Sequence, residues 1–178
     1  MKKAIAAILL SLSLATAASS HAEEQMATSQ ELREMVFSIS AADIGIDREN
    51  YPLPVWGTVM ETGFSDSGYY TLVVLADGTV SLYLSNGGGI IGAGTHENVQ
   101  QPAGRFLVFS KDFYDLAQPS GSHAVPEANH VNFYFLTDEG IYKYGAPEET
   151  LWKGEDPFSP LFLAGHAVIS EIRSIQQK

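Results

Sequence analysis

The chain has 178 residues, of which 21 are acidic and 10 basic, so its formal net charge at pH 7 is −11. A field of this sign disfavours nucleic acids and anionic membranes as partners and favours basic proteins or cations. The chain contains no cysteine, which excludes thiol catalysis and zinc–thiolate sites. The length indicates one domain that is large enough to bury its own core.

Residues 1–22 have the pattern of a secretory signal peptide. Lys2 and Lys3 precede an apolar run over 4–14, and Ser20-His21-Ala22 is a small-x-small cleavage site. The apolar run is well short of the ~20 residues that a membrane-spanning helix needs. We therefore expect cleavage near Ala22, a periplasmic or secreted protein, and no membrane insertion of the mature chain. Loss of the two lysines lowers the net charge to about −13.

Residues 23–29 are polar and are expected to form a disordered leader, followed by one α+β domain over 30–178. Apolar residues at helical spacing predict a first helix over 30–42, capped by Ser29 or Thr28. The next expected elements are strands over 55–62, 69–76 and 79–85. Asp77-Gly78 separates the last two strands and is typical of a type I′ hairpin turn.

The side-chain alternation within these strands predicts which residues share a face of the sheet. In the first strand, one face is expected to carry Trp56, Thr58, Met60 and Thr62, and the other Val55, Gly57, Val59 and Glu61. The second strand is apolar without interruption, which indicates that both faces of the sheet are covered there. In the third strand, Val80, Leu82 and Leu84 alternate with Ser81, Tyr83 and Ser85.

The second half of the chain predicts a helix that Thr95 caps and that keeps its period to Leu116. Pro102 either kinks this helix or places its true start near Gln101. Strands over 130–137 and 141–144 follow a loop over 118–129, and the sequence around Leu151-Trp152 favours a short helical turn. Ser159-Pro160 begins the last helix.

These elements predict a largely antiparallel five-stranded sheet with packed helices, in the order α-β-β-β-α-β-β-α. The order is similar to that of profilin-like and roadblock-like sandwiches, a likeness of shape that implies no function.

Four segments resemble the core pattern of an uncharacterised bacterial protein family. They are Pro54-Val55-Trp56-Gly57, Met60-Glu61-Thr62-Gly63, Leu75-Ala76-Asp77-Gly78-Thr79, and the run from Ser81 to Gly92. The resemblance covers about residues 53–107 and extends loosely to the last helix. It implies no known activity, cofactor or site residue.

The glycine-rich segment 86–95 and the helix start that follows it are the predicted binding site. Its residues are Asn86, Gly87, Gly88, Gly89, Thr95, His96 and Glu97. Glycines let a ligand approach backbone N–H groups, and a helix N-terminus attracts anions. The spacing is neither a phosphate-binding loop nor a dinucleotide fingerprint. The alternative is a tight structural connection in which Glu97 complements the helix dipole.

The other candidate chemistries lack a supporting pattern. Four histidines, His96, His123, His130 and His166, show no metal-ligand spacing, and no nucleophile-elbow motif is present. Glu61 and Asp66 form a candidate carboxylate pair for glycoside hydrolysis, but Glu61 is explained equally well as a strand residue and Asp66 as a turn residue. We expect no catalytic residues, no metal and no cofactor.

The main hypothesis is an exported, non-enzymatic binding protein, of immunity or inhibitor type, whose acidic surface binds a basic protein partner. Its expected centre is the glycine-rich segment with His96 and Glu97. The alternatives are a small-molecule or anion-binding domain, with or without enzymatic activity, built on the same segment, and a structural domain that self-associates. The sequence leaves the oligomeric state open.

Overall fold

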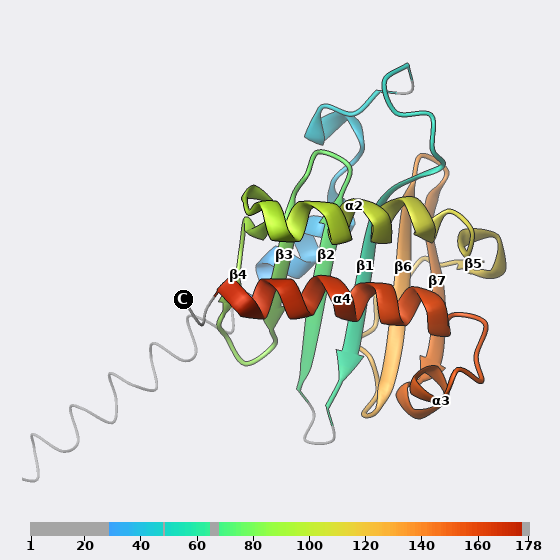
Figure 1. Cartoon of the computed structure of the whole chain (residues 1–178). Helices are drawn as coiled ribbons and strands as arrows, with labels where there is room; N and C mark the ends of the chain where they lie inside the picture. The colour runs from blue at the N-terminus through green and yellow to red at the C-terminus, as the bar shows by residue number, and fades with distance from the viewer. Residues whose placement is uncertain (1–28, 48, 65–67, 176–178) are drawn as a thin grey trace, which may run out of the picture.

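An antiparallel sheet forms the middle layer of the molecule, with helices on both of its faces (Figure 1). The computed structural model describes residues 29–47, 49–64 and 68–175. The predicted signal peptide and residues 23–28 of the predicted leader lie outside this range. Within it, no helix is both long enough and apolar enough to cross a membrane.

In the described residues the sheet has seven strands in the order β4-β3-β2-β1-β6-β7-β5. The strands are β1 (Val55–Gly63), β2 (Tyr69–Leu75), β3 (Val80–Leu84), β4 (Gly89–Ile90), β5 (Gln118–Pro119), β6 (His130–Thr137) and β7 (Gly140–Pro147). The α-helices after the sheet begins are α2 (Glu97–Ser110), α3 (Glu148–Lys153) and α4 (Ser159–Ile175). The short 3₁₀ turns are η1 (Ala42–Ile44), η2 (Ala93–Thr95) and η3 (Tyr114–Leu116).

The α+β class and the antiparallel sheet are confirmed, whereas the prediction of five strands is wrong. The two additional strands, β4 and β5, have two residues each and form the edges of the sheet. A pair of residues is too short to show an alternating pattern, so the sequence gives no strand signal there. The predicted element order changes accordingly, with β4 before α2 and β5 after it.

The hairpin at Asp77-Gly78 is confirmed, but the turn type is not. The Gly78 N–H donates to the Leu75 carbonyl at 3.1 Å, and the Leu75 N–H donates to the Thr79 carbonyl at 2.9 Å. Gly78 has φ of +90°, whereas Asp77 has no positive φ. The connection is therefore a three-residue loop with a left-handed glycine, and the Asp77 carboxylate fixes it by accepting bonds from the Thr79 N–H and hydroxyl.

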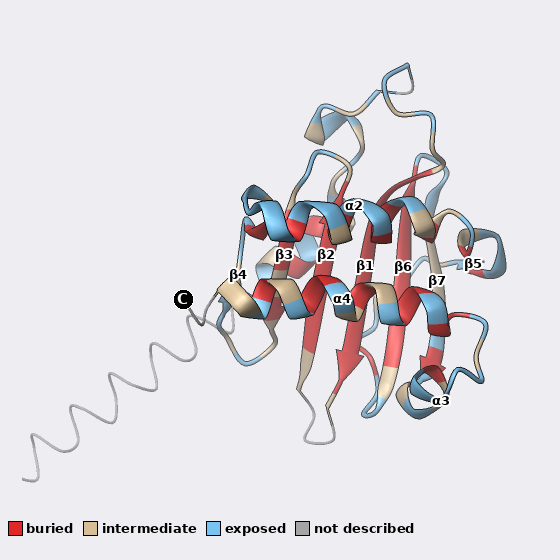
Figure 2. Cartoon of the chain, in the orientation of Figure 1, coloured by how far each residue is buried: buried red, intermediate tan, exposed pale blue. Residues whose placement is uncertain are grey.

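Apolar side chains fill the space on both faces of the sheet, and the central strands are buried along most of their length (Figure 2). On one face, α2 and α4 cover β1, β2 and β6. Gly165 lets α4 approach β1 closely, because a Cβ at this position would lie 2.8 Å from the Met60 Sδ atom. The uninterrupted apolar run of β2 serves both faces as predicted, since Leu72 and Val74 join one core and Val73 and Leu75 the other.

The helix boundaries differ from the predicted ones at three places. The first helix is described from residue 29 and ends at 38, and the predicted continuation forms η1. Helix α2 begins at Glu97 and contains Pro102, so of the two alternatives the start near Gln101 is excluded. It ends at Ser110, and η3 replaces its predicted last turns. The predicted start of α4 at Ser159 is confirmed.

Candidate functional site: an apolar cavity at one end of the sheet

Residues 29–47 lie across the face of the sheet that α2 and α4 leave uncovered, and we call them the N-terminal cover (Figure 1). Val36 is buried against this face, with Leu32, Phe37 and Ile39 partly buried around it. The apolar stripe predicted for the first helix thus packs on the sheet. It forms a second, smaller core with side chains of the central strands.

A buried ion pair joins the cover to the centre of the sheet. Arg33 Nε and Nη2 donate to the two carboxylate oxygens of Glu61 at 2.7 and 2.9 Å. The Glu61 side chain has no solvent exposure, and it also accepts a bond from the Thr71 hydroxyl at 2.9 Å. Burial lowers the pKa of Arg33, but the hydrogen bond and the charge of Glu61 together outweigh that effect and raise it. Glu61 therefore serves the fold, and its predicted partner Asp66 lies outside the described residues.

His123 extends this arrangement toward the end of the cover. Arg33 Nη2 donates to the His123 carbonyl oxygen at 2.6 Å. The imidazole stacks on the Phe37 ring, with the ring centroids 4.3 Å apart and the planes 4° from parallel. Burial first, and then the charge of Arg33, lower the pKa of His123. The lowered pKa favours the neutral form of the stacked ring. Phe37 also meets the Tyr134 ring edge-on, with the centroids 4.8 Å apart.

A β-bulge places Trp56 beneath the cover. Val55 pairs with Thr137 and Gly57 with Leu136, so Trp56 is the extra residue between two pairs. The sequence alternation put Trp56 on the same face as Met60, and this prediction is wrong. Trp56 packs with Val59 in the core under the cover, whereas Met60 packs beneath α2 and α4. The bulge is the reason, because one extra residue reverses the side-chain direction.

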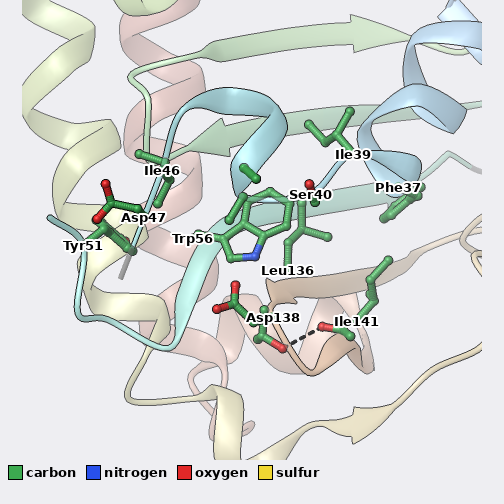
Figure 3. A pocket seen from close by; sticks show the side chains of 14 residues that line it. Phe37, Ile39, Ser40, Ile46, Asp47, Tyr51, Trp56, Leu136, Asp138 and Ile141 are labelled. Carbon is green, nitrogen blue, oxygen red and sulfur yellow. Dashed lines mark hydrogen bonds between the residues drawn. The ribbon is translucent and has the colours of Figure 1, made fainter. Parts of the chain in front are cut away.

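Beside Trp56, the cover and the end of the sheet enclose an open cavity of about 520 Å³ (Figure 3). Figure 3 shows the Trp56 indole between the side chains of Tyr51, from the loop before β1, and Ile141, from β7. Most of the lining is apolar. It consists of Phe37, Ile39, Ala41, Ala42, Ile46, Tyr51, Trp56, Leu136, Gly140 and Ile141, with Ser40, Asp47, Thr137 and Asp138 as the polar members.

The polar side chains of the lining make bonds that hold the surrounding loops. The Ser40 hydroxyl donates to Asp43 at 2.7 Å, and the Thr137 hydroxyl donates to the Gly140 carbonyl at 2.7 Å. Asp47 accepts from the Glu49 and Asn50 N–H groups at 2.9 and 3.0 Å, and these bonds lower its pKa. The cavity thus has a mainly apolar wall, and its polar side chains hydrogen-bond within the loops that form it.

Acidic residues lie at the same end of the sheet as this cavity, and two of them, Asp47 and Asp138, belong to its lining. The 43–51 loop, the β2–β3 turn and the β6–β7 turn meet at the same end of the sheet. They carry six exposed carboxylates, from Asp43, Asp47, Glu49, Asp77, Asp138 and Glu139, which we call the acidic rim. Arg48 is the one basic residue within these stretches of sequence, and it lies outside the described residues.

The structure separates the two halves of the predicted glycine-rich site. Asn86, Gly87 and Gly88 form the turn that ends β3, and Gly89 belongs to β4. By Gly94 the chain has reached Gly78, at the opposite end of β3. A five-residue strand spans about 16 Å, so Thr95, His96 and Glu97 lie well away from the turn at Asn86.

Close packing explains several of these glycines. A Cβ on Gly94 would overlap the Gly78 carbonyl oxygen, and a Cβ on Gly89 would overlap the Leu82 carbonyl oxygen. The Gly87 N–H donates to the Leu84 carbonyl and the Gly92 N–H to the Ser81 hydroxyl, and the N–H groups of Thr95 and His96 donate to carbonyls within the segment. Glu97 lies in the first turn of α2, where its charge complements the helix dipole. These contacts support the structural alternative, and the binding role stays a prediction.

The histidines of the described residues lie apart in the fold. His96 precedes α2, His123 stacks on Phe37, and His130 begins β6. His166, on α4, lies 3.3 Å from the Tyr70 hydroxyl through its Nε2 atom, and burial lowers its pKa to about 4. Among the residues that the structure describes, no three His, Asp or Glu side chains cluster in a way that would hold a metal ion.

The comparisons with known proteins add no relative. No family model matches the chain, and no curated protein or solved structure is similar to it at a significant level. The profilin-like or roadblock-like shape therefore stays a prediction. The candidate site is defined by its own geometry alone.

Sequence reasoning missed both the cavity and the buried ion pair under the cover. The cavity depends on the bulge at Trp56 and on the fold of the 40–51 loop, neither of which has a periodic pattern. The available signal was local. Asp47, Asn50 and the prolines at 52 and 54 mark a structured loop immediately before a strand whose second residue is aromatic.

Proposed function

We propose that this protein is an exported, non-enzymatic binding protein that captures a basic protein partner at the acidic rim. The observation that carries the proposal is the gathering of six exposed carboxylates on three loops at one end of the sheet. Opposite charge across an interface speeds the encounter and selects the partner. Export is supported by the signal-peptide pattern of residues 1–22.

The buried ion pair supports the same proposal by fixing the surface. Arg33 and Glu61 attach the cover to β1, and the last residues of the cover include Asp43 and Asp47 of the acidic rim. The Asp47 and Asp77 carboxylates accept backbone bonds inside their own turns. A charged surface whose loops are already ordered loses little conformational entropy when a partner binds.

The test is affinity capture with mature protein, residues 23–178, against the exported proteins of its own organism. A rim variant, Glu49→Lys/Asp77→Lys/Glu139→Lys, is compared with a matched variant, Asp115→Lys/Glu127→Lys/Glu155→Lys. Both variants change the net charge by the same amount, and all six positions are exposed. We expect a basic protein to be retained by the wild type and the matched variant and lost from the rim variant.

Equal loss from both triple variants would show that only the total charge matters and would overturn the location at the rim. A third variant, Glu97→Lys, tests the glycine-rich segment. Loss of the partner from Glu97→Lys alone would move the binding surface to the start of α2, as the sequence predicted. Retention by every variant would contradict charge-based capture.

A further inference from the structure

We infer that the cavity beside Trp56 binds an uncharged apolar small molecule, an alkyl chain or an aromatic ring. This site shares Asp47 and Asp138 with the acidic rim, but the inference does not depend on the proposal of a basic partner. The carrying observation is an open cavity of about 520 Å³ whose walls are mainly aliphatic and aromatic. Cavities of roughly 300–1,000 Å³ with such walls are typical of small-molecule sites.

The chemistry of the lining selects against charged ligands. Ser40, Asp47 and Thr137 are already bonded to their own loops, and Tyr51 donates its hydroxyl to the Val55 carbonyl at 2.9 Å. The only ionisable side chains among the described lining residues are the Asp47 and Asp138 carboxylates and the Tyr51 phenol. A fatty acid would bring its carboxylate toward Asp47 and Asp138, whereas the matching alcohol carries no charge.

The walls of the cavity are held in place before a ligand arrives. Phe37 is fixed by its stack on His123 and its edge contact with Tyr134. Trp56 is only 4% exposed and is anchored in the bulge of β1. Since the ligand would not have to order these side chains, the apolar area that it covers contributes to affinity with little entropic cost.

The chain provides its own reporter for this site. It has two tryptophans, of which Trp152 is 52% exposed on α3, on the other side of the sheet. In a Trp152→Phe background, Trp56 emission reports the cavity alone. The probes are 1-decanol and decanoate, which share a chain and differ in charge. We expect 1-decanol to shift Trp56 emission saturably and decanoate to bind at least tenfold more weakly.

The specificity control uses two exposed alanines. Ala42 lines the cavity on the exposed turn η1, and Ala167 is exposed on α4. Ala42→Phe should fill the cavity and weaken 1-decanol binding at least tenfold, whereas Ala167→Phe should leave it unchanged. Circular dichroism and the midpoint of thermal unfolding verify that both variants fold.

Three results would overturn the inference. They are the absence of a saturable response to 1-decanol, equal binding of decanoate, and equal effects of the two phenylalanine variants. The rim variant Glu49→Lys/Asp77→Lys/Glu139→Lys replaces no residue of the cavity lining. It should keep 1-decanol binding, so failure of the cavity site and failure of the basic-partner surface are separately visible.

Discussion

Arg33 and Glu61 form a two-pronged ion pair across 28 positions of sequence, and neither side chain is more than 9% exposed. Arg33 belongs to the N-terminal cover, and Glu61 lies near the C-terminal end of the central strand β1. The pair is a buried polar contact between these two parts. The Thr71 hydroxyl also donates to the Glu61 carboxylate, and the His123 carbonyl also accepts a bond from the Arg33 guanidinium.

Arg33→Met should destabilise the protein by about 3–5 kcal/mol, because it leaves the Glu61 carboxylate buried without its counter-ion. The double variant Arg33→Met/Glu61→Leu should recover most of that loss, since no charge then remains buried. The free energy of unfolding, measured in urea, gives both values. The control is Lys153→Met, which breaks the exposed pair with Glu149 and should cost less than about 0.5 kcal/mol. A loss of similar size in both single variants would contradict the role given to the Arg33–Glu61 pair.

Gly94→Ala should destabilise the protein by about 1–3 kcal/mol, because its Cβ would overlap the Gly78 carbonyl oxygen and force the backbone apart. The control is Gly104→Ala on α2, where a Cβ would meet no atom within 4 Å. That change should stabilise the helix by roughly 0.5–1 kcal/mol. The free energy of unfolding of the two variants, measured by chemical denaturation, tests both expectations. A Gly94→Ala protein as stable as wild type would remove the packing explanation of the glycine-rich segment.

Stability should fall as the pH decreases from about 6.5 toward 4, in part because of His166. Burial lowers the pKa of this residue to about 4 in the folded protein, below the ordinary value of 6.5. Between these values the unfolded chain binds the proton and the folded chain does not, so acid favours unfolding. His166→Gln should reduce this slope of unfolding free energy against pH. Tyr70→Phe should keep it, because burial, not the Tyr70 hydroxyl, is the first cause. An unchanged slope in His166→Gln would refute the assignment.

Ser110→Ala should cost about 1–3 kcal/mol, more than Thr58→Val. The Thr58 hydroxyl donates to the Ser110 hydroxyl at 2.9 Å, and Ser110 donates in turn to the Leu107 carbonyl at 2.6 Å. Removal of Ser110 leaves a buried donor without an acceptor, whereas removal of the Thr58 hydroxyl leaves the second bond intact. The double variant should be more stable than Ser110→Ala alone. Thermal unfolding of the three proteins measures the order, and the reverse order would refute this account of the contact between β1 and α2.

The parts of the fold that local patterns specify could be predicted. The apolar run of β2, the alternation in β3 and the Asp77-Gly78 pair define a hairpin, because each depends on neighbouring residues only. Ser159-Pro160 marked the start of α4 for the same reason. Pro102 left two alternatives open, a kinked helix or a helix that starts near Gln101. The structure keeps it inside α2, where packing of Val99, Ala103 and Phe106 on the sheet outweighs the loss of one backbone bond.

The candidate site could not be predicted, because it arises from contacts between distant segments. In its local sequence Glu61 is an ordinary strand residue. Its partner Arg33 lies 28 positions away, and only the fold brings the two side chains together. Trp56 was assigned to the wrong face, since a single bulged residue reverses a pattern of period two. The glycine-rich segment was predicted as a binding site from its composition. Composition does not distinguish close backbone packing from ligand binding.

The outermost strands of the sheet have a consequence for the behaviour of the protein at high concentration. Both edges end in strands of only two residues, β4 and β5. On one edge Pro119 has no N–H to offer, and on the other Gly89 has φ of +136°, outside the extended conformation of a regular strand. Among the described residues, the outermost strands are thus both short and irregular, and strands of this kind disfavour edge-to-edge pairing with another chain. The chain contains no cysteine, so its strands stay paired without a disulfide.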